Sequence, residues 1–263
     1  MGRETAPCYA GAMLSSLPDL ATFSFLLAGA LAAGFVTGFA GFGTGLVASG
    51  FWFHVLPAVF VPPIVVVASV AGQLVGLVGL RPKFDWPRTL PYLVGGALGV
   101  PLGVMALSQA SPELLRLSVG LFLVGYALSQ LTGLARLCIG NWGGRRSDAA
   151  VGLGGGVLGG FAGLSGPLPL IWLQLRGGPS IDQRAVYQPF NLIVLAIAGA
   201  GMAGAGQING PVLSALLIVV PGTIIGAVAG ARFYRRASEA TFRKVVLALL
   251  LISGIMLVVQ SLW

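Results

Sequence analysis

The chain has 263 residues, of which 56% are apolar and only 8% are charged. Soluble domains carry about 25% charged residues, so this composition excludes an ordinary soluble domain. The net charge of +8 comes from basic residues in short segments between apolar stretches. Nucleic-acid binding is therefore not expected, because a basic stripe on a soluble module is missing.

Uncharged windows of about 20 residues recur along the whole chain and are typical of helices that span a membrane. The 41 glycines suit helices that pack closely in a bilayer. The sequence therefore predicts an all-α, multi-pass membrane protein, which we place in the inner (plasma) membrane. Residues 1–21 are expected to form a polar N-terminal tail, because they lack the apolar core and cleavage site of a signal peptide.

The apolar segments follow one another with short loops between them. Residues 22–40 and 43–56 form a pair joined at the glycine-rich Gly41–Gly45. The predicted crossings are 58–80, 89–108, 114–135, 185–206, 211–231 and 242–263.

Residues 149–175, between the third and fourth crossings, are apolar and rich in glycine, and they break at Ser165-Gly166-Pro167. A continuous helix is not expected, because Pro167 and Pro169 lack amide donors and clash with the preceding turn. Two short arms, 151–163 and 167–175, are predicted to meet at this tip.

The two halves of the chain are alike. Phe39-Ala40-Gly41 recurs 122 positions later as Phe161-Ala162-Gly163. Gly95, Gly99 and Gly103 recur 127 positions later as Gly222, Gly226 and Gly230. We interpret this as a duplication. The first repeat covers 22–138, a cytoplasmic linker covers 139–148, and the second repeat covers 149–263.

Loop charges predict the orientation of the chain. Thirteen of the fifteen Lys and Arg residues lie in the four loops 81–88, 136–146, 176–184 and 232–244. The positive-inside rule places all four in the cytoplasm. Segment 149–175 then begins and ends inside and is too short for two crossings of about 20 residues, so it is predicted to be re-entrant. Its counterpart 22–56 would enter from outside, which makes the repeats inverted.

No predicted segment carries an Asp, Glu, Lys or Arg at its centre. All seven carboxylates lie in loops or at segment ends, and there is one histidine, His54. Cys8 and Cys138 lie far apart and are interpreted as unpaired thiols. No enzymatic activity, catalytic residue, metal site or cofactor is predicted. His54 near an outer boundary is interpreted as incidental, with a role in proton coupling as the alternative.

The two hairpin tips are the candidate substrate-binding site. Helix starts present unpaired amides and a partial positive charge, which favour anions. Thr44 and Ser165 add hydroxyls, and Gln73, Gln188 and Asn191 are polar residues within the crossings. For GxxxG spacings on the arms, such as Gly34/Gly38 and Gly156/Gly160, helix packing is the favoured interpretation. The predicted substrate-binding residues are Gly41, Gly43, Thr44, Gly163, Ser165, Gly166, Gln73, Gln188 and Asn191.

Two further observations leave alternatives open. Ser69 and Gln73 share a helix face, as do Gln188 and Asn191, and these pairs either line one cavity or bond helices together. Arg81 and Arg184 flank crossings on the cytoplasmic side. We interpret them as topology signals, with attraction of anions to a pore mouth as the alternative.

The glycine-rich Gly34–Gly45, its echo Gly156–Pro167 and the two related halves resemble the TauE/SafE family of membrane exporters. The resemblance spans most of 22–263 and implies export of sulfite or small organosulfonates such as sulfoacetate. The chain departs from the family in its second tip, where Ser-Gly-Pro replaces a run of three glycines, so the resemblance leaves the substrate open.

The sequence as a whole predicts a secondary transporter that exports a small anion by alternating access. The expected partners are this anion and the lipid bilayer, with a homodimer left open as the oligomeric form. A passive anion channel and a non-transporting membrane scaffold are the alternatives.

Overall fold

A computed structural model describes residues 20–80, 84–133, 139–140, 142–233 and 239–262. Every regular element in these ranges is a helix, as predicted. The tail 1–19, Cys8, Arg81, Arg136 and Cys138 lie outside the described residues. The helices are α2 (Leu20–Ala40), α3 (Thr44–Trp52), η1 (Ala58–Phe60), α4 (Val61–Leu80), α5 (Trp86–Gln109), α6 (Pro112–Leu131), α7 (Gly144–Ala162), α8 (Pro167–Arg176), α9 (Ser180–Gly204), α10 (Gly210–Phe233) and α11 (Glu239–Leu262).

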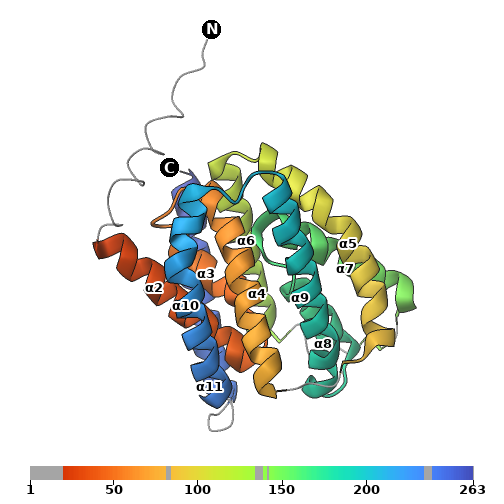
Figure 1. Cartoon of the computed structure of the whole chain (residues 1–263). Helices are drawn as coiled ribbons and strands as arrows, with labels where there is room; N and C mark the ends of the chain where they lie inside the picture. The colour runs from red at the N-terminus through yellow and green to blue at the C-terminus, as the bar shows by residue number, and fades with distance from the viewer. Residues whose placement is uncertain (1–19, 81–83, 134–138, 141, 234–238, 263) are drawn as a thin grey trace.

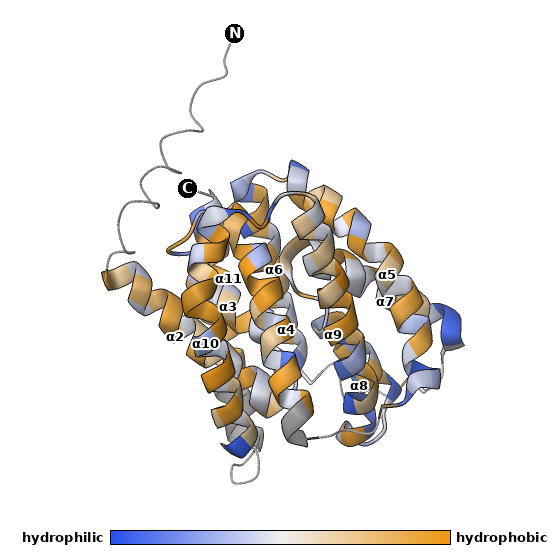
Figure 2. Ribbon diagram, in the orientation of Figure 1, coloured by the Kyte–Doolittle hydropathy of each residue, from blue (hydrophilic) through white to orange (hydrophobic). Residues whose placement is uncertain are grey.

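Six helical stretches are long and apolar enough to cross a membrane: α2, Ala58–Leu77, α5, α6, α9 and α10. Large apolar side chains are exposed on these helices, which Figure 2 shows as largely hydrophobic. On α5, Leu90, Val94, Leu98 and Leu102 are each more than half exposed and follow one another every four residues. Such a stripe faces a single side of the helix and suits contact with lipid chains. The chain is a multi-pass all-α membrane protein.

The helices α4, α6 and α10 run downward in Figure 1, and α5, α9 and α11 run upward. The ends of α4, α8 and α10 that lead into basic loops therefore lie at the lower end of the bundle, where α5 and α9 begin. This is the arrangement that the loop charges predict. Figure 2 also shows hydrophilic residues around the lower ends of α8 and α9.

Two hairpins, α2–α3 and α7–α8, enter the bundle from different sides (Figure 1). Each first arm packs along a helix of the other half of the chain, α2 along α10 and α7 along α5. A β-carbon on Gly38 would lie 2.0 Å from the carbonyl oxygen of Ala227, and one on Gly160 would lie 2.4 Å from that of Val100. These arm glycines allow backbones to touch, which confirms the packing interpretation of the GxxxG spacings.

Several boundaries differ from the prediction. Helix α7 begins at Gly144, seven residues before the predicted arm, and so extends into the predicted linker. Its early start carries Asp148 into the helix, where the carboxylate is paired inside the protein. Helix α2 is 21 residues long, enough by length to cross. Its C-terminal end is nevertheless covered by α4 and α9, because Gln73 donates to the carbonyl of Gly41 (3.0 Å) and Tyr187 donates to that of Ala40 (2.8 Å).

Candidate functional site

The first tip is rich in backbone donors. Gly41 (φ 79°) and Gly43 (φ 105°) adopt left-handed conformations that reverse the chain between α2 and α3. The first backbone hydrogen bond of α3 is donated by the amide of Val47 to the carbonyl of Gly43 (3.0 Å). The amides of Thr44, Gly45 and Leu46 therefore have no acceptor within the helix, which makes this end of α3 suited to an anion.

At the second tip, the start of α8 is poor in backbone donors. Gly163 (φ 73°) ends α7, and the amides of Gly163 and Leu164 donate to Gly159 (2.9 Å) and Leu158 (3.2 Å). Helix α8 begins at Pro167, as predicted, but Pro167 and Pro169 have no amide hydrogen. In the first three positions of α8 only Leu168 can donate. The start of α8 therefore has fewer amide donors than the start of α3.

Both tip hydroxyls are engaged within the protein. The Thr44 hydroxyl is hydrogen-bonded to that of Thr37, and the Ser165 hydroxyl donates to Oδ1 of Asn191. All four side chains are buried. These bonds hold the tips in place, so Thr44 and Ser165 are positioned by the fold before any ligand arrives.

The two tips meet inside the bundle. A β-carbon on Gly45 would lie 2.6 Å from the carbonyl oxygen of Gly163, so the two backbones are in direct contact. Beside this contact lies a small cavity of about 10 Å³, room for about one water molecule. None of its lining residues is charged: Gly43, Thr44, Gly45, Leu46, Ser69, Gly163, Leu164, Gly166, Pro167, Asn191 and Leu195.

The structure brings most of the predicted site residues to this place. Of the nine, Gly43, Thr44, Gly163, Gly166 and Asn191 line the cavity. The other four do not line the cavity: Gly41, Gln73, Ser165 and Gln188. Gln73 holds Gly41, Ser165 holds Asn191, and Gln188 bonds to Arg184 below the first tip.

Ser69 is the polar lining residue that was left out of the predicted site. Its side chain is 2% exposed, it lines the cavity, and its hydroxyl has no hydrogen-bond partner. Most buried hydroxyls have a partner, so an unpaired one facing a cavity indicates a place for a ligand or water. The sequence did indicate Ser69, because it lies four residues before Gln73 and so shares a helix face with it.

Arg184 and Tyr187 also belong to this region, although Arg184 was interpreted as a topology signal. The guanidinium of Arg184 lies against the first tip, since a β-carbon on Gly41 would come 2.8 Å from Arg184 Nη2. Arg184 Nε donates to Gln188 Oε1 at 3.2 Å. Arg184, Gln188 and Asn191 follow at helix spacings of four and three residues, a pattern that points them to one face.

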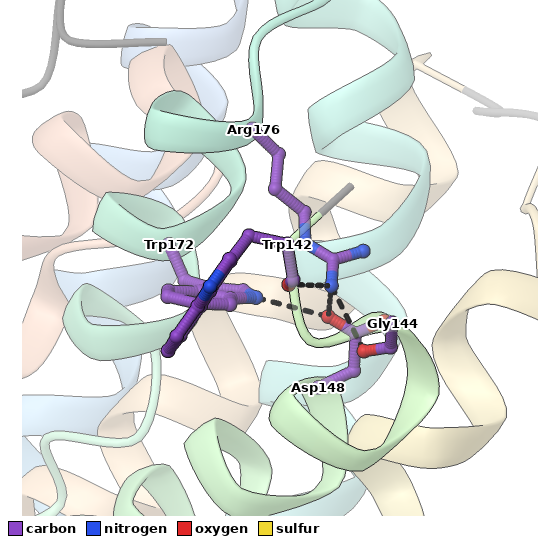
Figure 3. Close-up of polar contacts among 5 residues, drawn as sticks. All are labelled: Trp142, Gly144, Asp148, Trp172 and Arg176. Carbon is purple, nitrogen blue, oxygen red and sulfur yellow. Dashed lines mark hydrogen bonds and ion pairs between the residues drawn. The ribbon is translucent and has the colours of Figure 1, made fainter. Parts of the chain in front are cut away.

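A charged cluster closes the base of the second hairpin (Figure 3). Asp148 of α7 pairs with Arg176 at the end of α8, with 3.2 Å between Oδ1 and Nη2 and side-chain exposures of 9% and 11%. The indole of Trp172 donates to the same carboxylate at 2.9 Å, and Arg176 lies 5.4 Å from the Trp172 ring centre. Asp148 thus has a structural role. Among the described residues no group of three or more His, Cys, Asp or Glu side chains is placed to hold a metal.

These features define a class: multi-pass helical membrane proteins with an uncharged polar site between two buried hairpin tips. The chain matches the family model described as Sulfite exporter TauE/SafE over residues 26–257, and it belongs to that family. This is a family of transporters, not of enzymes, and it implies membrane transport of sulfite or related anions. No curated protein and no solved structure matched the chain.

Proposed function

We propose that this protein is a secondary transporter that exports sulfite or a small organosulfonate such as sulfoacetate. The substrate would bind in the cavity between the hairpin tips, at Gly41, Gly43, Thr44, Gly163, Ser165, Gly166, Gln73, Gln188 and Asn191, with Ser69 added. Location in the inner (plasma) membrane is part of the proposal.

The observation that carries the proposal is the unpaired Ser69 hydroxyl in a cavity that also meets the start of α3. The free amides of α3 provide donors and a partial positive charge. No carboxylate lines the cavity to repel an anion. Hydroxyl and amide donors of this kind bind the oxygens of a sulfite or sulfonate group.

The transport cycle is proposed to be alternating access between two inverted repeats. The pairing of α2 with α10 and of α7 with α5 supports this, since each hairpin arm rests on the other half of the chain. An inside-negative potential assists anion efflux by about 2.3 kcal/mol per charge per 100 mV. Facilitated efflux therefore needs no buried carboxylate to carry a proton.

The test is sulfite efflux from proteoliposomes, repeated with sulfoacetate, taurine and thiosulfate. We expect saturable flux for at least one of the sulfur oxyanions. In Ser69→Ala the half-saturating concentration should rise about two- to tenfold, the loss of one neutral hydrogen bond. Unfolding stability should stay unchanged, because the hydroxyl has no partner to lose. Ser24→Ala, an exposed serine of α2, is the matched control and should leave flux unchanged.

Three results would contradict parts of the proposal. Flux that never saturates indicates a channel, and absence of flux from folded protein indicates a scaffold. Unchanged transport in Ser69→Ala and in a Thr44→Ala/Ser165→Ala double variant would remove the tips from the site.

A further inference from the structure

Polar and apolar residues are divided unevenly along the two helices that flank the tips. In α4 the buried polar side chains are Ser69, at the middle of the helix, and Gln73, in its second half. In α9 Gln188 and Asn191 lie in the first half. Because α4 runs down and α9 runs up (Figure 1), both polar halves are at the lower end of the bundle. The opposite halves are apolar, for example Ile64 and Leu195, each 1% exposed.

Arg184 lies near the N-terminal end of α9, at the lower end of the bundle. It is one turn from the start of α9, next to the exposed Asp182, and is itself partly buried. Its guanidinium lies against Gly41, and its Nε donates to Gln188 Oε1 (3.2 Å). A positive charge is therefore fixed between the lower end of the bundle and the first tip.

The carboxamide of Gln188 is oriented by that contact. Its oxygen faces Arg184, so its nitrogen points the other way, towards α4, where a β-carbon on Gly76 would lie 3.6 Å from Nε2. Gln188 is 0% exposed and Nε2 has no hydrogen-bond partner. A fully buried donor without an acceptor costs free energy unless a ligand or water satisfies it.

We infer that Arg184 and Gln188 form a second anion-binding site, on the cytoplasmic side of the tip cavity, which takes up a compact oxyanion before it reaches the tips. The inference rests on the proposed function. The guanidinium supplies charge and a planar set of donors that matches two oxygens of a sulfonate, sulfite or carboxylate group. The Gln188 amide supplies a further, neutral donor. Among the described residues of α4 and α9, no equivalent buried polar set lies in the upper halves, so uptake occurs from the lower end.

Measurements on Arg184 variants distinguish a binding role from a purely structural one. Arg184 also lies at the C-terminal end of α2, where a positive charge stabilises the helix. That role affects unfolding stability, whereas a binding role affects the half-saturating anion concentration and its dependence on ionic strength.

The experiment compares wild type, Arg184→Gln, Arg184→Lys and Gln188→Met by equilibrium binding of sulfite to purified protein and by sulfite flux in proteoliposomes. We expect Arg184→Gln to raise the dissociation constant about ten- to a hundredfold, as for a lost charged hydrogen bond, and to abolish most of its salt dependence. Arg184→Lys keeps the charge and should raise the dissociation constant for sulfite about two- to tenfold. Gln188→Met should raise this constant by a similar factor. Arg146→Gln removes an exposed charge of α7 and is the matched control.

The outcomes separate this inference from the proposed function. Wild-type transport with unchanged sulfite affinity in folded Arg184→Gln and Gln188→Met overturns the inference and leaves the function standing. Binding without transport, with the affinity lost in these variants, supports the site and overturns the transport function. Absence of binding by the wild type, for sulfoacetate as well as sulfite, overturns both. If Arg184→Gln does not fold, unchanged affinity and salt dependence in Arg184→Lys and Gln188→Met overturn the inference.

Discussion

The two hairpins of this protein share a plan and differ in how their bases and tips are held. In both, a tryptophan of the second arm bonds to the first arm at the base. Trp52 donates to the carbonyl of Leu26 (3.3 Å), and Trp172 donates to the carboxylate of Asp148 (2.9 Å). Leu26 and Asp148 are 122 positions apart, the offset at which the two tips repeat. Among the described residues, an ion pair is found at the second base and not at the first.

The two tips differ in their backbone donors and in the residues that hold them. The first offers three amides at the start of α3 and is held from outside the hairpin, by Gln73 and Tyr187. The second has prolines at two of its first three helical positions and bonds to Asn191. Similar stretches of sequence therefore differ in role: the start of α3 has more free amide donors, and the second hairpin has the ion pair at its base.

The largest expected effect is at the base of the second hairpin. Asp148→Ala leaves Arg176 buried without its counter-ion and Trp172 without its acceptor, which should lower the free energy of unfolding by about 3–5 kcal/mol. Chemical unfolding in detergent measures this loss. Hydrogen exchange should show faster opening of α7 and α8 than of α2 and α3.

The exposed Asp85–Arg88 pair provides the control, because Arg88→Gln breaks a solvent-exposed contact of 3.9 Å and should cost less than about 1 kcal/mol. The double variant Asp148→Ala/Arg176→Ala should lose less than the sum of its single changes. Equal opening of the two hairpins in Asp148→Ala would show that the ion pair does not distinguish them.

The next effect compares a glycine from each tip. Gly45→Ala places a methyl group 2.6 Å from a backbone carbonyl that cannot turn aside, and should cost about 1–3 kcal/mol. Gly166→Ala meets the Asn191 side chain at 3.1 Å and has an ordinary φ of −74°, so its cost should stay within about 1 kcal/mol. Thermal unfolding of both variants tests the difference. A Gly166→Ala loss as large as that of Gly45→Ala would contradict the contact between the tips.

The sequence predicts those features of the fold and site that depend on residues close together in the chain. Loop charges, proline breaks and glycine spacings are local, and they predicted the helices, both hairpins and five of the residues that line the cavity. They could not find the Arg184 and Tyr187 contacts, because Tyr187 meets a carbonyl 147 positions away and only tertiary packing brings the two together. The buried place of Asp148 was missed for the same reason. The missing amides of Pro167 and Pro169 were read from the sequence, and they make the start of α8 poorer in donors than the start of α3.

The smallest expected effect concerns the hydroxyl pairs. Thr37→Val and Thr44→Val test a bond within the first hairpin, and Ser165→Ala and Asn191→Leu test a bond from the second tip to α9. Double-mutant cycles on unfolding stability should give coupling energies of about 0.5–1.5 kcal/mol for each pair. Comparable values would mean that both tips are held equally firmly, so that their difference lies in donors alone. A coupling near zero for Thr37 and Thr44 would instead leave the Thr44 hydroxyl free for a ligand, and would make the first tip richer in donors still.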